Sequence, residues 1–169
     1  IRFSPLKRDL MVLEHLEGKK IALVGLGVSQ VDFAIGLENS REWDEIWCIN
    51  SAGCVYPADR IFALDPASRF FDSDDAGKQT ASMVKLMSES DVPIYTCELD
   101  PRIKNPVLYP VEEVCNATQC AYLNNTVAYA IAYALYNKVG RIDLFGIDFS
   151  YKENMHFAEA GRACVEFWI

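Results

Sequence analysis

The side chain best suited to acid–base chemistry in this sequence is His156. An unperturbed imidazole titrates near neutral pH, so it can take a proton from a hydroxyl group. The other histidine, His15, lies among charged residues of a predicted short helix, where a surface position is expected. Glu159 and Arg162 could orient the His156 ring or meet a phosphate, although a solvated helix face explains them equally well. His156 could also be a residue that only caps or packs where a helix begins.

A turn containing glycine and serine lies between a predicted strand and a predicted helix. Residues 21–24 form an apolar run that is typical of a buried parallel strand. Gly25 and Gly27 let the chain turn and let a ligand approach the backbone, and Ser29 is expected to cap the helix with its hydroxyl group. Because the first amides of a helix and its dipole attract anions, this turn predicts a phosphate site.

The turn matches neither of the two common nucleotide motifs. The third glycine of the dinucleotide fingerprint is missing, since Ala34 and Gly36 fall at other offsets, and no Gly-Lys-Ser/Thr follows. The second predicted strand ends in Asn50 rather than in the acid that binds the NAD ribose. We therefore expect a nucleotide site of another type, or else a turn that binds no phosphate.

Apolar runs alternate with helical patterns along the whole chain. Strands are predicted over residues 21–24, 45–49, 60–64, 92–97 and 141–145. Helices are predicted over residues 9–17, 75–88, 126–137 and 157–169, in addition to the helix after the glycine turn. This order predicts one α/β domain over residues 1–169, a Rossmann-like three-layer sandwich on a mostly parallel sheet of about five to six strands.

Two segments carry more specific expectations. In the helix after the glycine turn, Val31 and Ile35 are expected on the main apolar face, with Phe33 and Leu37 on its flank. Residues 99–121 are expected to be irregular, with a short edge strand or a loop over the site, because three prolines interrupt them.

Polar residues and glycines follow several of the predicted strands. Asn50 follows the second, Asp65 follows the third, and Gly146 and Asp148 follow the last. Ligands of open parallel sheets bind beyond the carboxyl ends of the strands. These residues and the turn at 25–29 are therefore expected to lie along one edge of the sheet, at a shared site.

The composition indicates a globular protein with an acidic surface. Of 169 residues, 51% are apolar and 24% charged, and the net charge is −8. This charge argues against duplex nucleic acid or an anionic membrane as the main partner. No apolar run approaches the roughly 20 residues of a membrane span, and no secretory signal is recognised, although the chain starts without methionine.

The six cysteines form no Cys-x-x-Cys pair. We interpret them as reduced thiols rather than as a disulfide framework or a metal site, which predicts a cytoplasmic location. The last predicted helix reaches Ile169 without a cap, so the natural chain could continue beyond it. The sequence is compatible with a homo-oligomer.

Taken together, several short motifs resemble the bacterial CMP-sialic-acid-dependent sialyltransferases and their wider relatives, which include the 6-hydroxymethylpterin diphosphokinase-like proteins. The similarity covers about residues 20–167, with its best stretch over 128–149 and a poorly matched middle. The motifs are Gly-x-Gly-x-Ser at 25–29, Cys-x-Asn at 48–50, Asp-Pro at 65–66, and Leu-Phe-Gly-Ile-Asp-Phe at 144–149 after an alanine-rich helix.

The resemblance implies roles for individual residues. The glycine turn, through Gly25, Gly27 and Ser29, would hold the phosphate of the donor nucleotide, and Asn50 would bond to the nucleotide or its sugar. Asp65 stands where the family has an asparagine that touches the donor.

Further roles fall on the second half of the chain. Asn125 and Thr126 stand where the family has Ser-Gly against the cytidine. His156 would be the general base, and Tyr151 is the candidate for a tyrosine that assists departure of the phosphate.

The chain also departs from the family pattern. Leu26 replaces an asparagine between the two glycines, and Val28 replaces a proline. The lid before the catalytic histidine is shortened to residues 150–155.

Three hypotheses follow from the sequence. The first is a glycosyltransferase that moves a sugar from a nucleotide-activated donor to the hydroxyl of a small molecule or glycan. CMP is a candidate for the donor nucleotide. This enzyme needs no metal or further cofactor, and His156 is its base. The second is an ATP-dependent pyrophosphokinase-like enzyme in which Asp65 and Asp148 hold Mg²⁺. The third is a nucleotide-binding module without catalytic activity.

Overall fold

Six parallel strands form a single sheet in the computed structural model, which describes residues 14–39, 42–74, 77–150 and 154–169. The order across the sheet is β5-β4-β3-β2-β1-β6, and every neighbouring pair is parallel. The strands are β1 (Lys20–Val24), β2 (Glu45–Ile49), β3 (Arg60–Phe62), β4 (Ile94–Thr96), β5 (Pro106–Leu108) and β6 (Arg141–Phe145). The predicted α/β sandwich is therefore confirmed.

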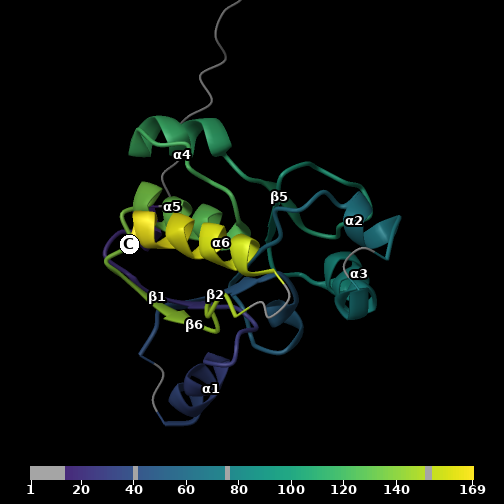
Figure 1. Cartoon of the computed structure of the whole chain (residues 1–169), viewed down its shortest axis with the longest axis horizontal. Coiled ribbons are helices and arrows are strands. Elements are labelled where there is room, and N and C mark those ends of the chain that lie inside the picture. The colour runs from purple at the N-terminus through teal and green to yellow at the C-terminus, as the bar shows by residue number, and fades with distance from the viewer. Residues whose placement is uncertain (1–13, 40–41, 75–76, 151–153) are drawn as a thin grey trace, which may run out of the picture.

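Helices cover both faces of this sheet (Figure 1). One face packs against α1 (Gln30–Asn39), α2 (Ser68–Phe71) and α3 (Thr80–Glu89). The other packs against α4 (Val111–Thr118), α5 (Thr126–Tyr136) and α6 (Met155–Trp168). Short 3₁₀ turns are η1 (Glu14–Leu16), η2 (Asn50–Cys54) and η3 (Gly77–Gln79).

The strands are apolar on both sides because each side faces a layer of helices. In β1, Ile21 and Leu23 join the core beneath α5 and α6, whereas Ala22 and Val24 join the core beneath α1 and α3. All four side chains are fully buried. This double burial explains the uninterrupted apolar run that predicted the strand.

The predicted apolar face of α1 is wrong. Val31 and Ile35 are exposed, and the fully buried residue is Phe33. Its ring packs against the rings of Trp43 and Phe145 at centroid distances of 5.4 Å. Aromatic packing contributed by distant segments therefore decides which side of α1 faces the sheet.

The segment at 99–121 is more regular than expected. It contains the edge strand β5, which was one of the two alternatives, and also the helix α4, which was not predicted. Pro110 immediately precedes α4, where a proline is tolerated, and the helix has only eight residues. Of the predicted helix at 9–17, the structure describes only η1 and the residues after it.

A buried ion pair lies at the amino end of the strands, opposite the edge where ligands are expected. Arg60, 9% exposed, donates from Nε to Glu45 Oε2 at 2.8 Å and from Nη2 to Oε1 at 3.1 Å. Its Nη1 donates to the hydroxyl of Tyr95, and Trp47 Nε1 donates to Glu45 Oε2. The pair therefore joins the starts of β2 and β3.

Replacing Glu45 by alanine should destabilise the fold by about 3 kcal/mol, because Arg60 would keep a buried charge without its partner. Urea denaturation measures this free energy of unfolding. The control is Asp91→Ala, whose carboxylate pairs with Lys104 on the surface and should contribute less than about 1 kcal/mol. Equal losses of unfolding free energy in the two variants would show that the buried Glu45–Arg60 pair matters no more than a surface ion pair.

The same pair predicts a pH dependence. Burial raises the pKa of Glu45, but hydrogen bonds from Arg60 and Trp47 outweigh burial, so its pKa lies below the ordinary value. The resulting stabilisation is fully present above the unfolded-state pKa of about 4.3 and is lost as the pH falls through the lower folded-state value. The Glu45→Gln variant should lack this component in unfolding measurements between pH 3 and 5, a range of about two units around that pKa.

Candidate functional site

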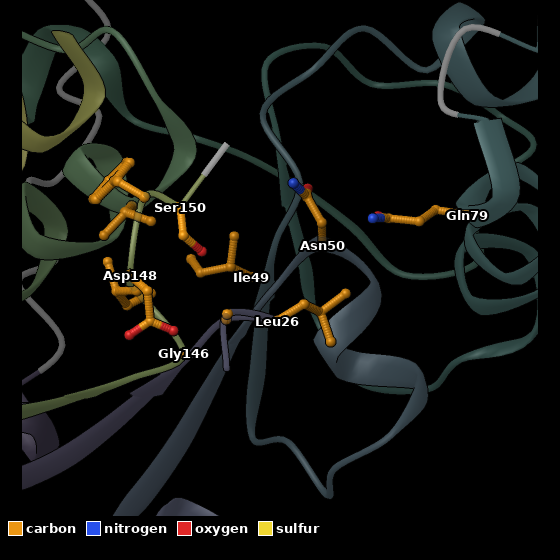
Figure 2. Close-up of a pocket in the computed structure, with 12 residues that line it drawn as sticks. Leu26, Ile49, Asn50, Gln79, Gly146, Asp148 and Ser150 are labelled. Atoms are coloured by element: carbon orange, nitrogen blue, oxygen red, sulfur yellow. The ribbon is translucent and has the colours of Figure 1, made fainter. Parts of the chain in front are cut away.

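Two adjoining cavities lie at the carboxyl edge of the sheet, with volumes of about 310 and 620 Å³. The smaller one lies between the turn after β1 and the turn after β6 (Figure 2). Here the strand order reverses direction, since β1 has β2 on one side and β6 on the other. Open α/β sheets bind ligands at such switch points. The residues shared by both cavities are Ile49, Asn50, Gln79, Val127 and Phe149.

The amide end of α1 already holds a carboxylate. Asp148 accepts hydrogen bonds from the Ser29 backbone N–H at 2.9 Å and from the Ser29 hydroxyl at 2.5 Å. The Ser29 hydroxyl in turn accepts from the Gly146 N–H at 3.0 Å, so it bonds to the β6 turn rather than to the α1 amides as expected. Asp148 thus occupies the place that the sequence offered to a phosphate.

The glycines of the turn are explained by the same close approach. A Cβ atom at Gly27 would overlap the Asp148 carboxylate, and one at Gly25 would lie 2.6 Å from the Gly146 carbonyl oxygen. The Gly27 N–H also donates to that carbonyl oxygen at 2.8 Å. Two backbone turns therefore pack directly on each other, which requires glycine without any bound ligand.

Asn50 is the most unusual polar residue of the groove. It begins η2 directly after β2 and has a left-handed backbone, with φ at +48°. Its side-chain oxygen Oδ1 is buried and has no hydrogen-bond partner in the described structure. Both features cost free energy, and such features concentrate at functional sites. Phe149, which also lines both cavities, has a left-handed backbone as well, with φ at +47°.

Gln79 reaches the groove from η3. Ser51, which is only 5% exposed, donates from its hydroxyl to Gln79 Oε1 at 2.7 Å. Because the oxygen of the Gln79 amide is used in this way, its NH₂ group is free to face the cavity. Figure 2 shows the Gln79 side chain extended towards Asn50.

The larger cavity contains a salt bridge and the start of α5. Arg69 Nη1 donates to Asp65 Oδ1 at 2.8 Å, and both residues line the cavity wall. Asn125 caps α5 by accepting from the Ala128 N–H, and its NH₂ group donates to the Gly161 carbonyl. Asn125 therefore also joins α5 to α6, next to Thr126 on the cavity wall.

Most of the residues singled out in the sequence meet at this groove. Five line the smaller cavity, namely Gly25, Gly27, Asn50, Gly146 and Asp148. Asp65, Asn125 and Thr126 line the larger one together with Asn50. Ser29 lies behind the smaller cavity, bonded to Asp148.

His156 lies on the first turn of α6 and is exposed. The buried side of that helix includes Ala158, Gly161 and Val165, and at about 100° per residue His156 projects roughly half a turn away from them. It is not among the residues that line the cavities described above. Tyr151 lies outside the described residues.

No ligand role was predicted from the sequence for the remaining polar lining residues, Gln79, Asn124, Ser150 and Arg69. Gln79 carries no motif, since its orientation depends on Ser51, 28 residues away. Arg69 had a local signal, because it follows Asp65 by four residues and pairs with it.

Metal ligands are not grouped in the part of the chain that the structure describes, where no three His, Cys, Asp or Glu residues could share an ion. Asp65 and Asp148, the pair considered for Mg²⁺, line different cavities and are bonded to Arg69 and Ser29. Among the described residues, no helix combines the length and apolar character that crossing a bilayer requires.

The sequence matches no family model, and comparison with curated proteins and with solved structures finds no match. A function can therefore be inferred only from the groove and from the sequence motifs.

Replacing Asp148 by alanine should destabilise the protein by about 2 kcal/mol, because the Ser29 N–H and hydroxyl lose a charged acceptor. Urea denaturation gives the free energy of unfolding. The control is Asp74→Ala, which removes an exposed carboxylate and should change that free energy by less than about 0.5 kcal/mol. If the two variants unfold at the same urea concentration, Asp148 does not hold the two turns together.

Proposed function

We propose that this protein binds a nucleotide-activated sugar in the groove at the carboxyl edge and is a sialyltransferase-like glycosyltransferase. The single observation that carries the binding step is Asn50, with its left-handed backbone and its buried, unpartnered oxygen. A buried acceptor without a partner costs about 1–3 kcal/mol. A ligand that donates a hydrogen bond to this oxygen recovers that free energy on binding.

The shape and chemistry of the groove support a ligand with several parts. The two cavities, about 310 and 620 Å³, adjoin along a shared wall and fall in the range of small-molecule sites. Among the residues that the structure describes, the lining offers amide groups from Asn50, Gln79 and Asn124 and one cation, Arg69. Neutral amides suit sugar hydroxyls and base edges, and a guanidinium suits a phosphate.

The transfer step rests on the resemblance in sequence, which assigns the general base to His156. Its chain neighbour Phe157 lines the larger cavity, and Met155 lines a third cavity of about 320 Å³ that shares Asp148, Phe149 and Ser150 with the smaller one. An acceptor that reaches the groove over the first turn of α6 would pass the exposed imidazole.

A thermal-shift screen tests binding directly. The ligands are CMP, UMP, GMP, ATP and their sugar conjugates, each with and without Mg²⁺. A ligand at 100 times its Kd should stabilise the folded state by about 2.7 kcal/mol and raise Tm accordingly. A shift that requires both ATP and Mg²⁺ would favour the pyrophosphokinase-like alternative, and no shift with any nucleotide would contradict the proposal.

Replacing Asn50 by glycine should separate stability from binding. Glycine adopts φ at +48° readily, and the unpartnered oxygen disappears, so the protein should become about 1 kcal/mol more stable. Nucleotide affinity, measured by calorimetry, should fall about tenfold or more.

The matched control for that variant is Lys138→Gly. Lys138 has φ at +55° and follows α5 at the end remote from the groove. It should tolerate glycine equally well and keep full nucleotide affinity. If Asn50→Gly also retains full affinity, the strained asparagine does not contact the ligand.

Replacing His156 by alanine should leave nucleotide affinity unchanged, because the side chain lies outside the cavity lining. If His156 is the base, transfer to the acceptor should fall about 100-fold or more. Glu112→Ala, at an exposed position on the first turn of α4, is the control and should retain transfer. A His156→Ala variant with normal transfer would exclude the imidazole as the base.

A further inference from the structure

We infer that the nucleobase occupies the smaller cavity, where Asn50 Oδ1 and the Gln79 NH₂ group bond to its edge, and that the phosphate lies in the larger cavity beside Arg69. This inference rests on the proposed function and adds an orientation for the ligand. The resemblance in sequence implies the reverse orientation, with the phosphate on the glycine turn and the base against Asn125 and Thr126.

The two cavities differ in the charged side chains that line them, since Asp148 lines the smaller cavity and the paired Asp65 and Arg69 line the larger one. The only charged side chain among the described residues lining the smaller cavity is Asp148, and no cation lines it. The Ser29 N–H and hydroxyl at the start of α1 already bond to this carboxylate. A phosphate at the glycine turn would therefore have to displace Asp148 or lie beside it, and both are unfavourable.

The larger cavity contains the one cationic side chain among the described lining residues of both cavities, Arg69. Its guanidinium carries five N–H donors, and the bond to Asp65 engages Nη1. The remaining donors suit a phosphate oxygen, and Asp65 holds the side chain in place on the cavity wall.

Asn50 and Gln79, which lie on the wall shared by the two cavities, bring a hydrogen-bond acceptor and a donor to the smaller cavity. Asn50 Oδ1 is a buried acceptor without a partner. The Gln79 amide is oriented by the nearly buried Ser51, which occupies Oε1 and leaves the NH₂ group as the donor. In Figure 2 the Gln79 side chain extends towards Asn50. Each nucleobase presents a neighbouring donor and acceptor on its edge, so the two amides complement it.

The walls of the smaller cavity are apolar enough to hold a flat ring, as are those of the larger one. Apolar side chains contribute much of the lining, from Leu26, Ile49, Val127, Ile147 and Phe149. An apolar wall with hydrogen-bonding groups at one end suits the faces and the edge of a base, whereas a sugar would place hydroxyl groups against hydrocarbon.

The test is calorimetric titration of the whole protein with the four common nucleosides, their 5′-monophosphates and a hexose 1-phosphate. Two variants are compared with the unaltered chain. Gln79→Glu removes the donor, and Arg69→Gln removes the cation while keeping a side chain of similar length. Gln119→Glu, the same substitution at an exposed position after α4, is the control.

For the base that binds, Gln79→Glu should weaken the nucleoside and the nucleotide alike, by about tenfold. Arg69→Gln should leave the nucleoside unchanged and abolish the additional affinity of the nucleotide. Gln119→Glu should change neither.

Three results would overturn the orientation while leaving the proposed function intact. In the first, nucleotides bind but Gln79→Glu has no effect. In the second, Arg69→Gln leaves the advantage of the phosphate in place. In the third, Gln79→Glu weakens the hexose phosphate and spares the nucleosides, which would place the sugar in the smaller cavity. If the unaltered chain binds no nucleotide, the proposed function and the orientation both fail.

Discussion

The contact between Asp148 and Ser29 determines how the carboxyl edge of this sheet is built. It links the turn after β1 to the turn after β6, at the one seam where neighbouring strands come from opposite ends of the chain. The two turns approach so closely that glycine is required at positions 25 and 27. The smaller cavity lies beside this contact, and a ligand there can bond only to groups that the contact does not already use.

A carboxylate at the start of α1 changes the meaning of a familiar pattern. Glycine turns that lead into helices often bind phosphate, because the helix amides lack partners within the chain. In this protein Asp148 is an internal partner for the Ser29 N–H and hydroxyl, so these two donors are bonded without a ligand. The unsatisfied atom of the groove is instead Asn50 Oδ1, and the lining cation is Arg69. The groups of the groove that can still bond to a ligand therefore lie away from the glycine turn.

Much of the fold could be predicted because parallel strands covered on both faces have continuous apolar sequences, as in β1. The position of Asn50, Asp65 and Asp148 at the same edge of the sheet could be predicted, because parallel strands end on one side. Contacts between distant residues could not be predicted. Ser29 and Asp148 are 119 residues apart, and nothing near Ser29 shows that its hydroxyl turns away from α1. The burial of Phe33 depends in the same way on rings from other segments.

The most direct test of nucleotide binding in the groove is an NMR titration of the side-chain amide signals with the nucleotide that stabilises the protein. The NH₂ signals of Asn50 and Gln79 should shift in proportion to occupancy. The NH₂ signal of Asn105, which donates to the Asp91 carbonyl away from both cavities, should stay in place. Shifts confined to residues outside the groove, with Asn50 and Gln79 unchanged at saturation, would contradict the account.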